Sequence, residues 1–169
     1  MKDEELLFLI GKGEADATKE LYQRYASKLF GYLVKMLREK AVAEDVLHDL
    51  FETVINKANQ FESSYSVSTW LFTIASNKAK NKFSCQQRFS EFDQEQIIAE
   101  PHEKTKDIPL NEAVHLLDEK HKSVIVLKYK QGFIISEIAK ILSISEGTVK
   151  SRLFTAHKKL NTLLQNHEK

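Results

Sequence analysis

The chain has 169 residues, of which 42% are hydrophobic and 29% charged, so it can build a core and is not compositionally disordered. Only 5 Gly and 2 Pro interrupt it, which favours long helices over an all-β fold with many turns. The single cysteine, Cys85, excludes an intrachain disulfide and a Cys-rich zinc site. No apolar run approaches the roughly 18 residues of a membrane span, and the acidic start is unlike a secretory signal. We therefore expect a cytoplasmic protein without membrane insertion.

The net charge of +1 conceals an uneven distribution along the chain. Residues 1–88 hold 13 basic and 12 acidic side chains, for a net charge of +1. Residues 89–109 hold 2 basic and 6 acidic side chains, for −4, and residues 110–169 hold 10 and 6, for +4. Such asymmetry indicates different partners for different segments.

The first half of the chain has the apolar periodicity of helices. Apolar residues recur every three or four positions over residues 4–37, with an interruption at Gly11 and Gly13, and again over residues 42–60. After a polar break, Ser66 or Ser68 can cap a further helix that becomes basic toward its end. We interpret residues 1–88 as one helical domain.

The second half is separated from the first by a segment without periodicity. Residues 89–109 contain both prolines and are acidic, which is typical of a flexible linker. Residues 110–169 regain helical periodicity and form a second helical domain. The predicted fold is therefore all-α, with two small helical domains joined by an acidic linker.

Residues 135–154 have the pattern of a helix-turn-helix. Two short helices fit on either side of a tight connection at 143–145, where Ser145 can cap the second helix with Thr148 three positions on. The outer side of the second helix then carries Lys150, Ser151, Arg152 and Phe154, followed by Lys158. An ordinary antiparallel helix pair with a solvated basic face is the alternative, but the coincidence of cap and outward polar set favours a helix that reads DNA in the major groove.

The sequence offers little for catalysis. None of the six histidines forms a His-Glu-x-x-His array, and there is no glycine-rich phosphate loop. Cys85 has no nucleophile-activating partner that the sequence identifies. We expect a protein that is not an enzyme and that has no catalytic residues, metal or cofactor.

Three segments carry a resemblance to a known family. Residues 146–153 are Glu-Gly-Thr-Val-Lys-Ser-Arg-Leu, residues 43–51 are Ala-Glu-Asp-Val-Leu-His-Asp-Leu-Phe, and residues 68–75, Ser-Thr-Trp-Leu-Phe-Thr-Ile-Ala, are followed by Asn77. They resemble, respectively, the recognition helix of the second domain, the polymerase-docking helix and the DNA-melting helix of the extracytoplasmic-function (ECF) sigma factors of bacterial RNA polymerase. The motifs occur in the family's order and span nearly the whole chain except the linker and the ends.

The resemblance implies a factor that directs core RNA polymerase to promoters. Its first domain, 1–88, would dock on the polymerase and open the minus-ten element, and its second, 110–169, would read the minus-thirty-five element. The implied partners are core polymerase and promoter DNA, with an anti-sigma factor as a further candidate. Ser143 stands where the family has a turn glycine, and a left-handed serine there would cost about 1 kcal/mol.

The resemblance places polymerase docking on a row of carboxylates. Asp45 and Asp49 share a helix face beside apolar neighbours, and an exposed aromatic beside charges is typical of an interface anchor. A solvated acidic face is the alternative. The docking candidates are Asp45, Leu47, Asp49, Phe51 and Glu52.

The resemblance also places capture of flipped minus-ten bases on the third motif and the loop before it. Such pockets combine amides for base edges, cations for phosphates and aromatics for stacking. The candidates are Phe61, Tyr65, Trp70, Asn77, Lys78, Lys80 and Asn81. Core packing is the alternative for Phe61 and Trp70, and a solvated face is the alternative for the lysines.

The resemblance places recognition of the minus-thirty-five element on the second helix of the helix-turn-helix. The minus-thirty-five candidates are Thr148, Lys150, Ser151, Arg152, Phe154 and Lys158.

A second function remains open at this stage. A transcription regulator with the same helix-turn-helix would carry a sensing or dimerising domain in front of it. The first half instead has an acidic helix followed by an aromatic and basic one, which favours the sigma factor.

Overall fold

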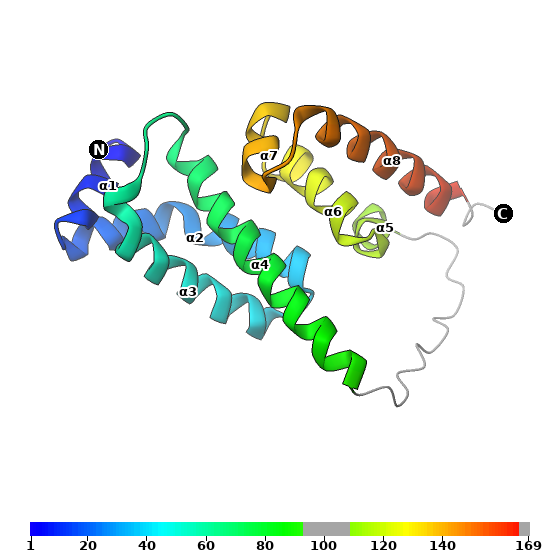
Figure 1. Ribbon diagram of the computed structural model, residues 1–169, viewed down its shortest axis with the longest axis horizontal. Coiled ribbons are helices and arrows are strands. Elements are labelled where there is room, and N and C mark those ends of the chain that lie inside the picture. The colour runs from blue at the N-terminus through cyan, green and yellow to red at the C-terminus, as the bar shows by residue number, and fades with distance from the viewer. Residues whose placement is uncertain (93–108, 166–169) are drawn as a thin grey trace.

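The computed structural model describes residues 1–92 and 109–165, with side chains for all of these except 86–92. Every regular element in those ranges is helical, which confirms the all-α prediction (Figure 1). The first domain comprises α1 (Asp3–Gly11), α2 (Ala15–Leu37), α3 (Lys40–Lys57), the short η1 (Ala58–Gln60) and α4 (Val67–Phe92). The second comprises α5 (Leu110–Leu116), α6 (Glu119–Ile125), η2 (Val126–Lys130), α7 (Ile135–Leu142) and α8 (Glu146–Gln165). Most of the predicted linker lies outside the described residues.

The helix expected over residues 4–37 is divided between α1 and α2 by its two glycines. Gly13 has a φ of +87°, a left-handed conformation that only glycine adopts without strain. At Gly11 a Cβ atom would lie 1.9 Å from the side-chain oxygen of Asn59 in η1, so a larger residue there would require the Asn59 side chain to move. The break therefore allows α1 to turn back onto the other helices of the domain.

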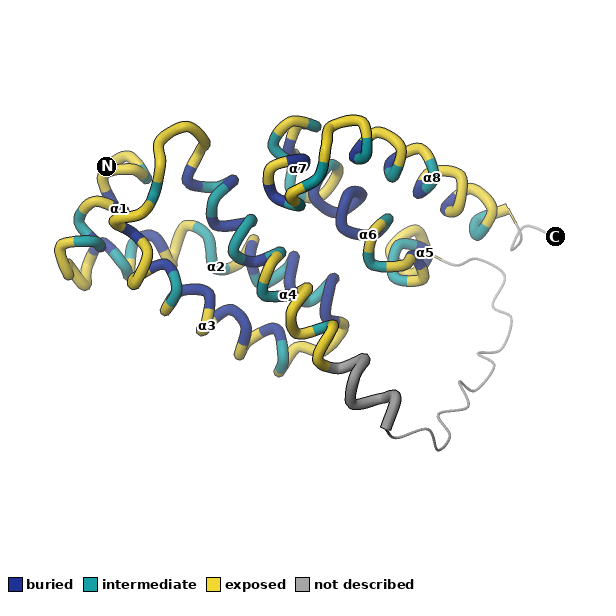
Figure 2. The backbone as a smooth tube through the Cα atoms, viewed as in Figure 1, coloured by how far each residue is buried: buried dark blue, intermediate teal, exposed yellow. Residues whose placement is uncertain are grey.

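The apolar stripes of α1 to α4 face one another and form the core of the first domain (Figure 2). Residues with no solvent exposure come from every one of these helices: Leu6, Leu21, Leu29, Leu33, Leu50, Val54 and Leu71. Each fully buried leucine or valine contributes about 1.5–3 kcal/mol of transfer free energy. Packing of amphipathic stripes therefore holds the helices together.

The second domain surrounds a separate set of buried side chains. Those with no solvent exposure include Ala113, Val124, Leu127, Ile138, Ile141, Val149 and Ala156. Between α6 and α7 the chain forms a π-helical turn, η2, which the sequence pattern did not predict. Widened turns of this kind are uncommon and shift the side chains that follow them around the helix. Here Tyr129 is turned outward and is 60% exposed.

The two domains pack against each other, with α4 of the first beside α7 of the second (Figure 1). An aromatic series crosses this contact. The ring of Phe72 on α4 lies edge-on to Tyr32 on α2, with centroids 5.5 Å apart, and edge-on to Phe133, with centroids 5.0 Å apart. Phe133 precedes α7, and both phenylalanines are buried. The interdomain contact therefore includes a small aromatic core.

Candidate nucleic-acid interface

The start of α8 is fixed by a serine cap. The Ser145 hydroxyl accepts a hydrogen bond from the backbone N–H of Thr148 at 3.1 Å, and the two side-chain oxygens are 2.8 Å apart. Because a free N–H in the first turn of a helix needs an acceptor, this contact sets where α8 begins. The preceding turn contains Ser143 in the left-handed conformation, with φ 54° and ψ 46°. The predicted cap is confirmed, and Ser143 has the left-handed conformation for which the sequence analysis gave a cost.

The outer side of α8 is open to solvent. Val149 and Leu153 are buried against the domain core, as the pattern predicted. Phe154 is 74% exposed. The other exposed candidates on α8 are Lys150, Ser151 and Lys158, whereas Thr148 and Arg152 are half-buried. An exposed aromatic among cations and a hydroxyl can contact base edges and phosphates together.

The loop before α4 is also held by a serine cap. The Ser66 hydroxyl accepts a hydrogen bond from the backbone N–H of Thr69 at 3.1 Å, so Ser66 rather than Ser68 is the cap. The rings of Phe61 and Trp70 lie edge-on with centroids 5.6 Å apart, and both side chains are half-buried. These two aromatics therefore hold the loop on the helix while keeping part of their surface accessible.

The basic face of α4 continues from that loop. Asn77, Lys80 and Asn81 are exposed and Lys78 is half-buried, so the two amides one turn apart share an accessible face. Tyr65 is 44% exposed, and the ammonium of Lys140 on α7 lies 4.5 Å from its ring centroid. Lys140 of the second domain thus contacts one of the minus-ten candidates of the first domain.

The acidic face of α3 differs from the sequence expectation in one respect. Asp45, Asp49 and Glu52 are exposed, as a docking row requires. Leu47 and Phe51 are each only 6% exposed, so the expectation that Phe51 is an exposed anchor was wrong. Both side chains belong to the core of the first domain because α3 is packed between its neighbours on that side.

Two apolar side chains that the sequence analysis missed lie beside this acidic face. Tyr22 on α2 packs on the ring of Phe51, with centroids 4.7 Å apart, and is itself 38% exposed. Ile55 on α3 is 47% exposed, and these side chains line a shallow hollow between α2 and α3. Tyr22 and Ile55 thus provide the exposed apolar surface expected of Phe51. The positions of Tyr22 and Ile55 in the helical repeat did not indicate that they are exposed, because their exposure depends on how α2 and α3 pack.

Polar contacts join the domains next to the aromatic core. The guanidinium of Arg38, at the end of α2, donates a hydrogen bond to the backbone carbonyl of His115. The ammonium of Lys35 donates one to the side chain of Asn111. Arg38 is left-handed, with a φ of 64°, a conformation that few non-glycine residues adopt. These contacts bind the end of α2 to α5 of the second domain.

A buried lysine lies in the same region. Lys122 on α6 is only 3% exposed, and burial, with Arg38 nearby, lowers its pKa to about 8. Burial also raises the pKa of the neighbouring Glu119 carboxyl, an effect that Lys80 and Lys122 partly offset. Both side chains line a hollow between the domains together with Arg38 and Lys80. The charges on the two sides of the contact are therefore electrostatically linked.

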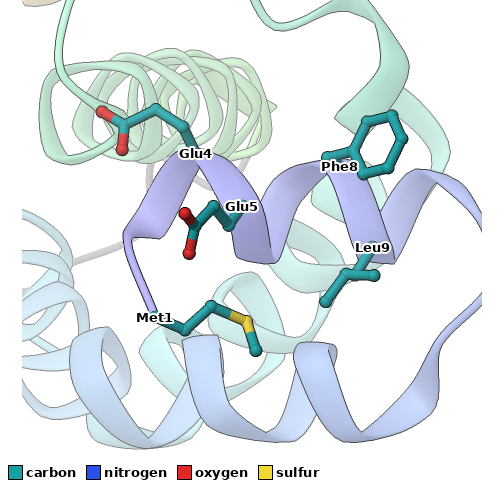
Figure 3. A pocket seen from close by; sticks show the side chains of 5 residues that line it. All are labelled: Met1, Glu4, Glu5, Phe8 and Leu9. Atoms are coloured by element: carbon teal, nitrogen blue, oxygen red, sulfur yellow. The ribbon is translucent and has the colours of Figure 1, made fainter.

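A further hollow lies at the start of the chain. Figure 3 shows a hollow whose lining residues all belong to the N-terminal segment, with Phe8 turned outward and the ammonium of Lys12 5.4 Å from its ring centroid. Cys85 is exposed. Within the described ranges, no three His, Cys, Asp or Glu side chains are grouped to hold a metal ion. No helix in those ranges has the length and hydropathy needed to cross a bilayer.

Comparison with known families gives the identity of both halves. Residues 21–89 match the model of sigma-70 region 2, and residues 113–161 match that of sigma-70 region 4. The RNA polymerase sigma factor CarQ of Myxococcus xanthus is 30% identical over 159 residues, covering 90% of this chain and 91% of CarQ. The ECF sigma factor SigX of Bacillus subtilis is 30% identical over 164 residues, covering 88% and 82%. The alternative function, a transcription regulator, would require a sensing or dimerising domain in the first half of the chain. That half matches sigma-70 region 2 instead.

Solved structures show the same fold. CnrH, determined in complex with the cytosolic domain of CnrY, superposes with a TM-score of 0.71 at 22% identity, over 95% of this chain and 96% of CnrH. The sigma factor RpoE of Bartonella quintana, determined with the anti-sigma factor NepR, also has a TM-score of 0.71 at 22% identity, over 86% and 94%. The sequence relatives and the matches to both sigma regions establish that this chain belongs to the ECF sigma factors and functions as a sigma factor of RNA polymerase.

Proposed function

We propose that three separate surfaces of the two domains carry out the sigma function. The acidic face of α3 binds core polymerase, the loop 61–66 with α4 holds flipped minus-ten bases, and α8 reads the minus-thirty-five element. The observation that carries the proposal is the outer side of α8, where Phe154 and the polar residues around it are uncovered by the rest of the molecule. The boundaries 1–88, 89–109 and 110–169 divide these tasks.

The exposed side chains of α8 have different roles in this proposal. Lys150 and Ser151 are exposed and approach base edges, where a donor or hydroxyl discriminates between bases. Arg152 is half-buried, so it orients the helix or holds a phosphate. Lys158, two turns further along, meets the phosphate backbone.

The docking role belongs to the carboxylates of α3 with the adjacent apolar pair. Asp45, Asp49 and Glu52 supply the charged rim, and Tyr22 and Ile55 supply the apolar contact. A partner surface with basic side chains around an apolar centre would complement this face. Leu47 and Phe51 are buried, and they support the docking face of α3 by packing beneath it in the domain core.

The remaining partner and the absence of catalysis follow from the same assignment. CnrH and RpoE were each solved with a second protein, and the one bound to RpoE is an anti-sigma factor. We expect an anti-sigma factor to bind this chain as well. The chain acts in the cytoplasm as a polymerase subunit without catalytic residues, metal or cofactor, and RNA synthesis belongs to the core enzyme.

Selection of promoters from a random DNA library tests the reading helix. Core polymerase of the same host is combined with the unmodified factor or with Ser151→Ala, and the recovered sequences are compared. A base-reading Ser151 changes the preference at a minus-thirty-five position, whereas the phosphate contact of Lys158 changes yield for all sequences alike when replaced by alanine. Identical sequence preferences for Ser151→Ala and the unmodified factor would remove Ser151 from the reading set.

A further inference from the structure

A hollow rich in cations lies between α2, α4 and α6. Its volume is about 560 Å³, which is within the range of roughly 300–1,000 Å³ that small-molecule sites have. Charged side chains make up much of its lining, and the cations outnumber the carboxylates. The cations are Arg38, Lys80, Lys120 and Lys122, and the carboxylates are Asp118 and Glu119. Such an excess of positive charge in a concave surface favours an anionic ligand.

Lys122 is the least accessible of these cations. It is 3% exposed, and none of the ion pairs among the described side chains includes it. Burial and the nearby Arg38 lower its pKa to about 8, and the carboxylates of Glu119 and Asp118 only partly oppose them. A buried charge without a close partner is costly. An anion in the hollow would supply the counter-charge that the protein itself does not.

The two carboxylates of the hollow do not balance its cations. Asp118 is already in contact with Nδ1 of His121 and lies 3.5 Å from the ammonium of Lys159, which is outside the hollow. Burial raises the pKa of the Glu119 carboxyl, so the surroundings of Glu119 disfavour its charged form. Room for negative charge therefore remains beside the cations.

The neighbouring His115 reports the same positive potential. Burial lowers the pKa of its imidazole, and the charges of Lys35, Lys122 and Arg38 lower it further, against a smaller opposing effect of Glu112. Cations from α2 and from α6 thus act on one place. Like charges brought together repel one another, and an anion between them removes that cost.

One wall of the hollow is apolar. Leu37 and Leu117 line it and are 6% and 2% exposed, and Phe83 on α4 lines it as a half-buried aromatic ring. An inorganic ion would leave this wall in contact with water. A ligand that joins an anionic group to an apolar or aromatic group would cover both parts of the hollow.

We propose that the hollow is a binding site for a small organic phosphate, whose phosphate group lies among Arg38, Lys80 and Lys122 and whose organic part lies on the apolar wall. Guanidinium and ammonium groups are the usual partners of phosphate oxygens, and the planar guanidinium can donate two hydrogen bonds to them at once. None of these contacts depends on the DNA-binding roles proposed above, although Lys80 is shared with the minus-ten candidates.

The lowered pKa of Lys122 gives this site a signature that the exposed lysines lack. At pH 8 about half of the Lys122 side chains carry a proton, and a bound anion makes the others take one up. Phosphate monoesters have a second pKa of about 6, so they are already dianions at this pH. Exposed lysines are already protonated, so a phosphate bound on the basic face of α8 takes up no proton through them.

Isothermal titration calorimetry of the full chain with phenyl phosphate at pH 8 tests the site. Titrations in two buffers with different ionisation enthalpies give the number of protons taken up, and we expect up to about half a proton for each ligand bound. Methyl phosphate has the same charge without the ring and should bind more weakly. Benzyl alcohol has the ring without the charge and should not bind.

Variants assign the binding to the hollow. Lys122→Met keeps an unbranched apolar side chain and should abolish the proton uptake and weaken binding about tenfold, as expected for loss of a hydrogen bond between charged groups. Arg38→Asn tolerates the left-handed conformation and should also weaken binding about tenfold. Lys128→Met removes the same charge from η2, outside the hollow, and should bind as the unmodified chain does. Circular dichroism establishes equal helix content.

Three results would overturn the proposal. The absence of heat from both phosphates in both buffers would mean that the hollow takes no phosphate group. Binding without proton uptake, or equal affinities for Lys122→Met and Lys128→Met, would place the phosphate on exposed cations elsewhere. Equal affinities for phenyl and methyl phosphate would mean that the apolar wall contacts no part of the ligand, so the site would not be one for an organic phosphate.

Discussion

The Ser145 hydroxyl accepts a hydrogen bond from the backbone N–H of Thr148 at 3.1 Å, and this contact fixes the first turn of the helix proposed to read DNA. Thr148 is half-buried and its hydroxyl is directed to Ser145 at 2.8 Å, so it serves the helix start before it serves a base. We therefore expect residues further along α8 to contribute more to DNA reading than Thr148. If α8 enters a groove, the cap determines which of its residues come first.

Loss of the cap should destabilise the protein. Ser145→Ala leaves a first-turn N–H without its acceptor, and we expect the free energy of unfolding to fall by about 1 kcal/mol. Urea unfolding of the full chain at pH 7 gives the value. Ser151→Ala on the outer side of the same helix is the control and should change stability by less than about 0.5 kcal/mol. Equal losses in the two variants would show that the cap contributes nothing of its own.

The left-handed turn predicts a stabilising substitution. Ser143 has a φ of 54° and a ψ of 46°, where a side chain is strained and glycine is not. Ser143→Gly should raise the free energy of unfolding by about 0.5–1 kcal/mol, less the extra backbone entropy of glycine in the unfolded chain. Gly132→Ala, at a φ of +78°, should act in the opposite direction. Destabilisation by Ser143→Gly would mean that the entropy of glycine outweighs the relieved strain.

Local features of the helix-turn-helix could be predicted from the sequence because their causes are local. A cap depends on a serine and on amides a few residues away, and the burial of Val149 and Leu153 follows from helical spacing within one segment. The two glycines before α2 are likewise visible in the sequence. The sequence analysis expected one helical segment interrupted there, whereas the structure has two separate helices, α1 and α2. Neither inference needed knowledge of distant contacts.

Features that depend on packing between distant segments could not be predicted in the same way. Phe51 has helical spacing that allows either exposure or burial, and the position of Tyr22 on another helix decides between them. The contact of Phe72 with Phe133 joins residues 61 positions apart, and no local pattern encodes it. The π-helical η2 is a third example, because a single extra residue in a turn leaves the apolar periodicity almost unchanged.

Charge reversal on α3 should weaken polymerase binding. Asp45→Lys with Asp49→Lys places two cations where a basic partner surface is proposed, and loss of two interfacial pairs costs on the order of 2–5 kcal/mol if they are desolvated. Equilibrium binding to core polymerase measures the effect, with circular dichroism to establish equal helix content. Glu4→Lys with Glu112→Lys, exposed on α1 and α5, makes the same change of charge elsewhere and should bind normally. Unchanged binding by the α3 variant would contradict the docking assignment.

The apolar neighbours of that face can be tested separately. Ile55 is 47% exposed, so Ile55→Ser removes apolar surface with a small effect on folding. If Ile55 lies in the docking contact, polymerase binding weakens about tenfold, since an anchor residue at an interface contributes 1 kcal/mol or more. Phe8→Ser on α1, also exposed, is the matched control and should leave the affinity unchanged. Equal affinities for the two variants would confine docking to the carboxylates.

Promoter opening should depend on Asn77. Its exposed amide can donate to and accept from a flipped base, and unstacking that base costs a few kcal/mol that contacts in the open state must offset. Asn77→Ala should therefore spare polymerase binding and duplex minus-thirty-five binding but slow open-complex formation. Potassium permanganate footprinting follows the opening, and a promoter with a pre-melted bubble should rescue much of the defect. Equal loss on closed and pre-melted templates would assign Asn77 to folding or simple binding.

The buried Lys122 predicts a stability that rises with pH. Burial lowers its pKa to about 8 in the folded protein, against 10.5 when exposed, so between these values the unfolded chain binds more protons than the folded one. Stability must then increase as the pH rises through that range, by on the order of 3 kcal/mol in all. Above pH 10 the burial of Tyr32 acts in the opposite direction, because it raises the pKa of that phenol to about 12.

Urea unfolding between pH 7.5 and 9.5 isolates the lysine when the chain is compared with Lys122→Met, which retains an unbranched apolar side chain without the charge. Groups that are the same in both proteins contribute to both curves, so the difference between the two curves belongs to Lys122. We expect Lys122→Met to be the more stable protein at pH 7.5 and the difference to shrink as the pH rises. Lys120 is exposed on the same helix, so the curve of unfolding free energy against pH for Lys120→Met should be parallel to that of the unmodified chain. Parallel curves for Lys122→Met would mean that the ammonium of Lys122 reaches water in the folded protein and bears no burial cost.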